Sequence, residues 1–295
     1  MMLRTLLSGL VCMGFVACAG AETESDDAQA RVLTIADVNA APAAWRQADP
    51  ENLVVLDTTK GEIIVELLPD VAPAHADQFR AYVRAGRYDR TPFHRVIKGF
   101  MAQGGDVAQT HGQDAMLAPM AGEFTFRRDP ADFMIDPIGP ADTATAGFHN
   151  GFPIETVAQF MSEMSFDGQV ETWMPHCKGV LSTARTGDPD SGNAQFFLIS
   201  DAGRHLDKDY TAKGRVLKGL DVVQAIKVGP IPDGYPIANP DLVRSAVMVA
   251  DMPEADRPVV YVQRTDTPEW TAILTAADRD RTDICDLPIV PVVVD

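Results

Sequence analysis

Several features that would assign a function at once are missing from this sequence of 295 residues. It has no G-x-x-x-x-G-K-S/T phosphate loop, no G-x-G-x-x-G fingerprint, no H-E-x-x-H zinc motif and no G-x-S-x-G nucleophile motif. The six histidines are scattered, so no cluster with metal-ligand spacing can be read from them. We therefore expect neither a bound metal nor any other cofactor.

Basic residues are scarce as well. The chain carries 25 Lys and Arg against 42 Asp and Glu, which gives a formal net charge of -17 and a pI of about 4.6. A field of this sign repels nucleic-acid phosphates and anionic lipids, so we exclude nucleic acid as a partner. We interpret the acidity as a solubility feature, because no run of like charges is long enough to form an interaction tail.

Long hydrophobic runs are absent except at the N-terminus. Arg4 precedes an apolar run over residues 6–19, and acidic residues end that run at Glu22. The run is shorter than the roughly 20 residues that a membrane span needs. It predicts a secretory signal over residues 1–21, and therefore export to the periplasm.

Two processing routes for this signal fit the sequence. Residues 19–21 form a small-x-small site for ordinary cleavage, whereas residues 15–18 resemble a bacterial lipobox with Cys18 as the lipid-bearing residue. We favour the lipid route, because small and then acidic polar residues follow Cys18. An uncleaved anchor is the third alternative. Membrane attachment is expected only through the signal or the lipid.

Cysteine is rare, and its positions are informative. Cys12 and Cys18 belong to the signal, so only Cys177 and Cys285 remain for the exported body. Export permits a disulfide, and we predict one between these two residues. The alternative is a pair of separately buried thiols.

The rest of the chain divides by composition. Residues 22–50 are predicted to be a polar linker with a short helix over residues 35–45, and the main folded domain is predicted over residues 51–250. Within that domain, residues 127–175 have weak periodicity and are interpreted as a long insertion. Residues 251–295 form a C-terminal extension.

Short strands separated by turns dominate the main domain. The β-rich runs at residues 53–56 and 63–67 flank a turn that ends at Gly61, which predicts a hairpin. Helices are expected after Pro73 and over residues 220–226. This pattern favours a mainly β barrel or sandwich capped by two helices. The apolar residues of the insertion are expected to cover core surface; they include Met161, Met164 and Phe166.

One stretch, F-H-R-V-I-K-G-F-M-A-Q-G-G-D at residues 93–106, stands out. Its simplest interpretation is two strands joined by a glycine turn, but that leaves Arg95 unexplained among apolar residues. Strand alternation places Arg95 on the opposite face from His94 and Val96. A fixed guanidinium beside Phe and Met side chains makes an apolar site with one strong donor fork, which matches a proline-containing peptide.

This stretch closely resembles the cyclophilin signature F-H-R-x-I-x-G-F-M-x-Q-G-G-D. Residues 179–185 and 193–199 resemble the second signature of the family, and residues 206–216 resemble the bacterial form of its closing segment. The blocks occur in the family's order and cover roughly residues 51–250. The resemblance implies a closed eight-stranded antiparallel barrel with a helix over each end, and peptidyl-prolyl cis-trans isomerase activity that assists the folding of exported proteins.

The resemblance also implies a site. Arg95 is the catalytic arginine and Gln103 orients it, while Gln195 contacts the peptide backbone of the substrate. The substrate side is implied to consist of Phe100, Met101, Ala184, Arg185, Gln195, Phe197, His205, Leu206 and Tyr210. Among these, Phe100, Met101, Phe197 and Leu206 line the proline pocket, and the strand at Ala184 and Arg185 supports the substrate.

Four positions depart from the pattern of the family. His205 stands where ligand-sensitive members carry Trp, and Tyr210 replaces a His of the eukaryotic form. Lys213 stands where Phe or Trp is usual, and Arg185 stands where many members have Asn. These departures concern efficiency and substrate range more than the fold.

Three functions remain open at this point. The leading one is an active isomerase that acts, as a monomer, on proline-containing unfolded or partly folded polypeptides. Its main rival is a binding module with the same fold that holds such segments without useful turnover. A structural envelope protein that merely uses the barrel is the third. Arg95, Phe100, Met101, Gln103 and Phe197 together favour the enzyme.

Overall fold

The computed structural model describes residues 32–276 and 283–295. The predicted export signal, with Cys18, lies outside the described residues. Within them, no helix is both long and apolar enough to cross a membrane.

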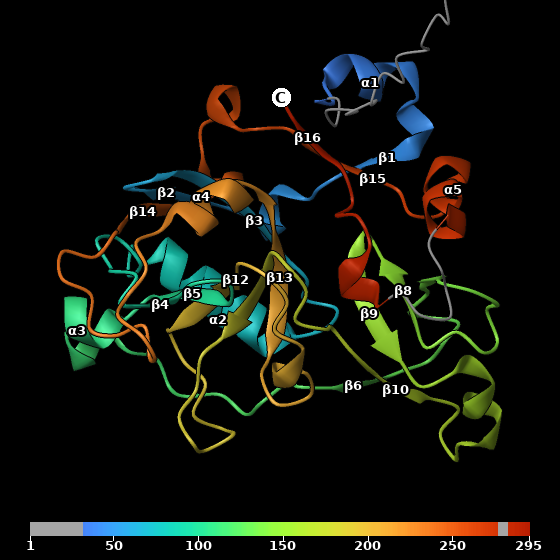
Figure 1. The fold of residues 1–295 in the computed structure, drawn as a ribbon, viewed down its shortest axis with the longest axis horizontal. Coiled ribbons are helices and arrows are strands. Elements are labelled where there is room, and N and C mark those ends of the chain that lie inside the picture. The colour runs from blue at the N-terminus through green and yellow to red at the C-terminus, as the bar shows by residue number, and fades with distance from the viewer. Residues whose placement is uncertain (1–31, 277–282) are drawn as a thin grey trace, which may run out of the picture. The chain divides into compact units, whose positions relative to one another are not determined.

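The largest sheet has eight antiparallel strands (Figure 1). Their order is β14-β2-β3-β13-β11-β12-β5-β4. The strands are β2 (Leu53–Thr58), β3 (Gly61–Leu67), β4 (Arg95–Ile97), β5 (Met101–Gly104), β11 (Val180–Thr183), β12 (Phe196–Ile199), β13 (Ala212–Lys218) and β14 (Val243–Met248). The predicted hairpin is confirmed, because β2 pairs with β3 and Gly61 has a φ of 140°.

The prediction of a closed barrel is wrong in one respect. The edge strands β14 and β4 do not pair with each other, so the sheet is curled but is not closed by a ladder of hydrogen bonds. One isolated bridge, between Pro92 and Leu242, joins the segments that precede them. Two backbone hydrogen bonds flank this bridge, from the Phe93 N–H to the Asp241 carbonyl at 2.8 Å and from the Val243 N–H to the Thr91 carbonyl at 2.9 Å. They do not continue into a ladder, since β4 has only three residues.

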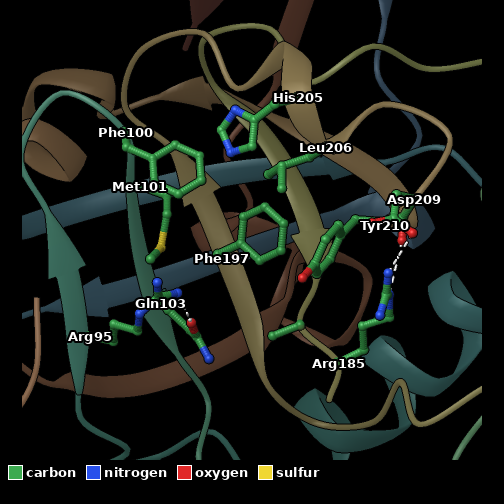
Figure 2. A pocket seen from close by; sticks show the side chains of 11 residues that line it. Arg95, Phe100, Met101, Gln103, Arg185, Phe197, His205, Leu206, Asp209 and Tyr210 are labelled. Atoms are coloured by element: carbon green, nitrogen blue, oxygen red, sulfur yellow. Dashed lines mark hydrogen bonds and ion pairs between the residues drawn. The ribbon is translucent and has the colours of Figure 1, made fainter. Parts of the chain in front are cut away.

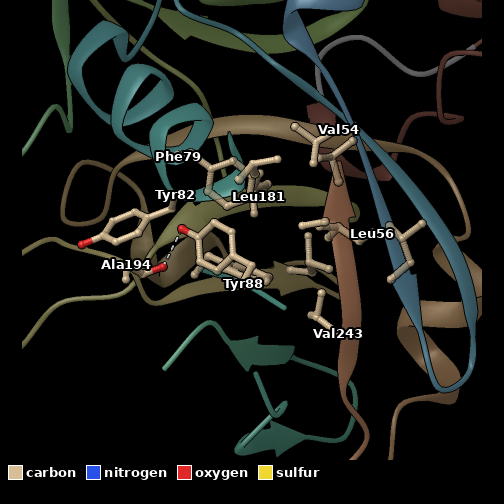
Figure 3. Packing of buried hydrophobic residues seen from close by; sticks show 14 of the residues in the cluster. Val54, Leu56, Phe79, Tyr82, Tyr88, Leu181, Ala194 and Val243 are labelled. Carbon is tan, nitrogen blue, oxygen red and sulfur yellow. Dashed lines mark hydrogen bonds between the residues drawn. The ribbon is translucent and has the colours of Figure 1, made fainter. Parts of the chain in front are cut away.

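A dense apolar core fills the inside of this sheet (Figure 3). Helix α2 (Pro73–Arg84) contributes Phe79 and Tyr82, and helix α4 (Leu220–Ala225) contributes Val223. The Phe196 ring meets the Phe79 ring edge to face at 5.6 Å, and the Tyr88 hydroxyl donates to the Ala194 carbonyl at 2.8 Å. Aromatic pairs of this kind add to the stabilisation from burial.

Strand alternation divides β12 between two faces. Phe196 and Leu198 belong to this core, whereas Phe197 and Ile199 belong to a second apolar cluster on the other face. The same holds for β5, where Ala102 points into the core and Met101 into the second cluster. The period of two therefore presents Phe197 and Met101 together on one side of the sheet.

Part of the predicted linker is folded. Residues 35–52 form α1 (Ile35–Ala40), η1 (Pro42–Ala44), β1 (Trp45–Gln47) and η2 (Pro50–Asn52). Strand β1 pairs with β15 (Val260–Gln263), which pairs with β16 (Val292–Val294). The expected helix over residues 35–45 is therefore wrong beyond Ala40. Such short strands carry almost no periodicity, and their pairing depends on residues far away in the chain.

The predicted insertion has a sheet of its own. Its order is β6-β10-β9-β8-β7, with β6 (Phe126–Arg128), β7 (Asp136–Pro137), β8 (Ala146–His149), β9 (Phe152–Thr156), β10 (Val170–Trp173) and the turn η4 (Gln159–Met164). The expectation that Met161, Met164 and Phe166 cover core surface is wrong. Met164 is 75% exposed and Phe166 is fully exposed, because both lie at the turn that joins β9 to β10.

The remaining elements are short. They are α3 (Val107–His111), η3 (Gln113–Ala115), η5 (Arg204–Leu206), η6 (Val249–Asp251), η7 (Glu254–Asp256), α5 (Pro268–Ala276) and η8 (Ile284–Asp286). The segment with η8 is tied to the body by a disulfide between Cys177 and Cys285, the pair for which a bridge was expected, with Cα atoms 4.8 Å apart. Leu287 and Val290 of the extension are buried in the second apolar cluster.

Candidate active site

A cavity of about 510 Å³ opens on the face of the sheet that carries Phe197 (Figure 2). Its walls come from β4, β5, β12, the turn η5 and the segments that follow β11 and precede β13. It is lined by Arg95, Phe100, Met101, Gln103, Ala184, Arg185, Phe197, His205, Leu206, Asp209 and Tyr210. Every residue predicted for the site except Gln195 therefore meets here, although the residues come from widely separated parts of the sequence.

A chain of hydrogen bonds fixes the guanidinium on one side of the cavity. Arg95 Nη1 donates to Gln103 Oε1 at 3.2 Å, and Arg95 Nε donates to the carbonyl of Asp233 at 3.1 Å. Gln103 in turn donates from Nε2 to Gln195 Oε1 at 2.9 Å. Arg95 and Gln103 stand opposite each other in the β4–β5 ladder, so the strand register brings them together. Gln195 does not line the cavity, and Gln103 connects it to the wall.

Apolar side chains form the body of the cavity. Phe197 lies at its centre in Figure 2, and Met101 and Leu206 are also largely buried. The Tyr210 ring meets the Phe197 ring edge to face at 5.8 Å. The rings of Phe100 and His205 lie 5.0 Å apart at the mouth of this region. A recess lined by such side chains suits a compact apolar ring.

The opposite side of the cavity holds an ion pair, of Arg185 with Asp209. Arg185 also donates from Nε to the Asp209 carbonyl at 2.9 Å, and its guanidinium lies 4.5 Å from the centre of the Tyr210 ring. The sequence reasoning missed Asp209. The reason is tertiary, because the Thr183 N–H donates to the Thr211 carbonyl, and antiparallel pairing then sets residue 185 beside residue 209.

Two titratable groups that neighbour residues of the site are withdrawn from water, the half-buried His94 and the fully buried Lys213. Burial lowers the pKa of His94, and the Asp106 carboxylate and a hydrogen bond with Gln195 only partly oppose this. Burial also lowers the pKa of Lys213 to about 7. Lys213 donates to the Thr183 hydroxyl at 2.8 Å, and its ammonium lies 4.6 Å from the centre of the Phe79 ring.

The chemistry that this arrangement supports is electrostatic. A fixed donor fork stands beside an apolar recess, and an ion pair stands across from it. Such a site can hold an apolar ring and stabilise a developing lone pair or partial negative charge near it. Among the described residues, no group of three or more His, Cys, Asp or Glu side chains could hold a metal ion.

The sequence model of one protein family, described as cyclophilin type peptidyl-prolyl cis-trans isomerase/CLD, matches residues 53–247. The chain belongs to this family. The matched range contains every residue of the cavity, so the cyclophilin resemblance of the three sequence blocks is confirmed.

Individual proteins agree with this assignment. A probable peptidyl-prolyl cis-trans isomerase of Brucella suis is 34% identical over 219 residues, which is 74% of this chain and 91% of that protein. The peptidyl-prolyl cis-trans isomerase cyp18 of Streptomyces antibioticus is 33% identical over 182 residues, covering 59% of this chain and 82% of its own.

The crystal structure of the cyclophilin AquaCyp293 from Hirschia baltica is similar over a wider range. It matches with a TM-score of 0.83 and 47% sequence identity, and it covers 90% of this chain and 98% of its own. The similarity therefore extends beyond the family domain at residues 53–247. The chain of 295 residues is therefore a peptidyl-prolyl cis-trans isomerase with a mainly β fold.

Proposed function

We propose that this isomerase assists the folding of proteins exported from the cytoplasm, and that Arg95 is its catalytic residue. The observation that carries the catalytic part is the chain from Arg95 through Gln103 to Gln195, which holds one guanidinium at the edge of an apolar recess. The clients are proline-containing unfolded or partly folded polypeptides, and the enzyme acts on them as a monomer.

The proposed mechanism needs neither a nucleophile nor a metal. Rotation about an X-Pro bond breaks amide conjugation, against a barrier of about 18–20 kcal/mol. At the top of this barrier the prolyl nitrogen regains a lone pair, which accepts a hydrogen bond that the planar amide cannot accept. A guanidinium aimed at that nitrogen therefore stabilises the twisted state more than either planar state, which is the requirement for acceleration.

The other side chains supply grip and orientation. Phe100, Met101, Phe197 and Leu206 hold the proline ring, so that the carbonyl side of the bond can turn. Gln103 keeps the Arg95 fork in its plane, and Gln195 reaches the client backbone. The strand end at Ala184 and Arg185 supports the client chain, with His205 and Tyr210 at the border of the recess.

Two observations support a location outside the cytoplasm. The apolar run at residues 6–19 has the composition of an export signal. In addition, the body contains a disulfide between Cys177 and Cys285, and disulfides persist mainly in oxidising compartments. We propose a periplasmic enzyme that is attached to the membrane by a lipid on Cys18.

Cell fractionation tests this location. The parent protein is expected with the membranes, and Cys18→Ser is expected in the soluble periplasmic fraction. Cys12→Ser, which changes the other cysteine of the signal, is the matched control and should behave as the parent. If the parent is fully soluble in the periplasm, the protein is not lipidated, and ordinary cleavage near Ala21 is the better interpretation. A cytoplasmic parent would end the export proposal.

A refolding assay tests the folding role. An exported protein whose refolding is limited by a prolyl bond should refold faster when the purified enzyme is added, because uncatalysed isomerisation takes tens to hundreds of seconds. Arg95→Ala should lose the acceleration. No acceleration by the parent would favour a protein that only holds its clients, and equal acceleration by Arg95→Ala and the parent would refute Arg95 as the catalytic residue.

A further inference from the structure

One wall of the cavity is a single turn that has little support of its own. His205 and Leu206 line the cavity from η5, and the turn contains two backbone hydrogen bonds, from Leu206 N to Gly203 O and from Asp207 N to Arg204 O. Isolated turns of this length are not stable, so contacts from elsewhere must hold η5 in place.

Arg204, the first residue of η5, makes such contacts on the side away from the cavity. Its Nη2 lies 2.6 Å from Glu155 Oε1 on β9 of the insertion. Its Nε lies 3.2 Å from Asp283 Oδ2 in the C-terminal extension, and its Nη1 lies 2.9 Å from Asp207 Oδ2. One planar fork therefore joins three carboxylates from three segments, a task that suits the geometry of arginine.

The carboxylates at this centre are themselves held. The side chains of Glu155 and Asp207 are only 16% and 13% exposed. Glu155 also accepts from Trp173 Nε1 on β10 at 2.9 Å, so the insertion presents it in a fixed position. Ion pairs of this kind, largely withdrawn from water, couple their partners more strongly than exposed pairs do.

A second connection runs from Asp207 to the floor of the cavity. Asp207 Oδ1 accepts from the His176 N–H at 2.7 Å and from His176 Nδ1 at 3.0 Å. The buried His176 ring lies nearly parallel to the Phe197 ring, at 6.1 Å and 18°. Cys177 follows directly and is bonded to Cys285, whose Sγ lies 3.8 Å from Arg204 Nη1.

We propose that Arg204 is a positioning residue through which the insertion and the C-terminal extension hold the client pocket in its binding shape. Its partners are Glu155 in the insertion and Asp283 beside the disulfide. It acts directly on the cavity wall formed by His205 and Leu206. It acts on Phe197 through Asp207 and His176. This gives both additions to the family domain a role in client binding. The inference depends on the isomerase activity and not on export.

The geometry separates binding from turnover. Arg95, Gln103 and Gln195 lie on or beside β4, β5 and β12, and the hydrogen bonds that hold Arg95 and Gln103 run to one another, to Gln195 and to the Asp233 carbonyl, not to the residues joined by Arg204. Loss of Arg204 would leave three carboxylates facing one another, and their repulsion would displace η5. The proline pocket would then bind clients more weakly, while the catalytic donor would stay in place.

Steady-state kinetics with a proline-containing tetrapeptide test the proposal. Arg204→Met should raise KM about fivefold or more and leave kcat within about twofold of the parent. Arg204→Lys keeps the charge but not the planar fork, so its KM should lie between those of the parent and Arg204→Met. The matched control is Arg127→Met, which removes an ion pair to Asp167 inside the same insertion and should leave both constants unchanged.

Substitutions at the residues that contact Arg204 provide an independent test. Glu155→Gln, Asp283→Asn and Cys285→Ser should each raise KM by a smaller factor, and Glu155→Gln should add little to Arg204→Met, because both act through one contact. These variants also carry the test if Arg204→Met does not fold. If the parent has no measurable turnover, the isomerase assignment fails, and the same variants are then compared by their Kd for the peptide.

Two results would overturn the proposal. One is a KM, or Kd, for Arg204→Met that differs from the parent by less than about 1.5-fold in a folded protein. The other is an equal rise for Arg127→Met, since that would assign the effect to general loosening of the insertion.

Discussion

Arg95 is unusual among the arginines at the cavity because its partners leave its charge uncompensated. It donates to an amide oxygen and to a backbone carbonyl, whereas Arg185 across the cavity is paired with the Asp209 carboxylate. Neutral partners orient a guanidinium without cancelling its field. Arg95 is therefore the cation at this cavity that is best able to stabilise a developing lone pair.

Replacing this one donor tests the assignment. Arg95→Ala should lower kcat/KM about a hundredfold, the loss that removal of one preorganised donor commonly causes. Circular dichroism and the Tm should stay close to the parent, because Arg95 lies on an edge strand. Lys98→Ala, an exposed cation in the adjoining turn, is the control. An activity within about twofold of the parent would refute the mechanism.

Lys213 predicts a dependence of stability on pH. Burial lowers its pKa from 10.5 to about 7 in the folded protein. Between these values the unfolded state binds more protons than the folded state, so the free energy of unfolding rises with pH and is lowest below pH 7. The contribution is at most about 1.4 kcal/mol for each pH unit.

Urea unfolding at a series of pH values between 7 and about 9.5 measures this effect. The parent should gain roughly 3 kcal/mol relative to Lys213→Met over that range. Lys218→Met, at the exposed end of the same strand, should keep the slope of the parent. Parallel curves for the parent and Lys213→Met would show that Lys213 keeps its proton throughout.

Turns determine how the elements around the site are joined. Gly99 lies between β4 and β5 with a φ of 70°, and Gly105 directly follows β5 with a φ of 76°. A Cβ at Gly99 would meet nothing within 4 Å, whereas a Cβ at Gly105 would lie 2.8 Å from the Phe196 ring and 3.0 Å from the Ala194 carbonyl. The same backbone conformation thus occurs once in open space and once against the core.

A pair of substitutions separates these two costs. Gly99→Ala should lower the free energy of unfolding by about 1–2 kcal/mol, the cost of the left-handed conformation alone. Gly105→Ala should lower it by about 3–4 kcal/mol, because overpacking of the core is added. Chemical denaturation measures both values. Equal losses would mean that Phe196 moves aside at no cost.

At the scale of the whole molecule, the extension and the body are joined covalently. The bridge between Cys177 and Cys285 spans 108 residues of sequence. The chain-entropy account gives such a loop up to about 4–5 kcal/mol of stabilisation, since the unfolded chain is restricted. The buried Trp270 and Leu287 show that the extension is also held by apolar packing.

Thiol counting and unfolding test the bridge together. Denatured, unreduced protein should contain no alkylatable cysteine beyond position 18, and two such thiols would rule the bridge out. The double variant Cys177→Ser with Cys285→Ser should be less stable by up to about 4–5 kcal/mol. The reduced parent should match that variant, and a large difference between the two would point to an effect of the serines themselves.

The sequence by itself, through its resemblance to one family, predicted the residues that line the cavity except Asp209. Arg95, Phe100, Met101 and Gln103 lie within one contiguous block, and local alternation already sets Arg95 on the opposite face from its neighbours in the sequence. The hairpin of β2 and β3 follows from two apolar runs and one turn. These features are local, and local chemistry is what a single sequence displays most directly.

Only the tertiary structure decided the rest. The pairing of β1 with β15 and β16, the separate sheet of the insertion and the open edge between β14 and β4 all depend on distant segments, and three-residue strands carry no readable period. Asp209 and Arg204 became significant because folding places them beside Arg185 and Glu155. The energy of such contacts depends on distance and burial, and neither is written in the order of the residues.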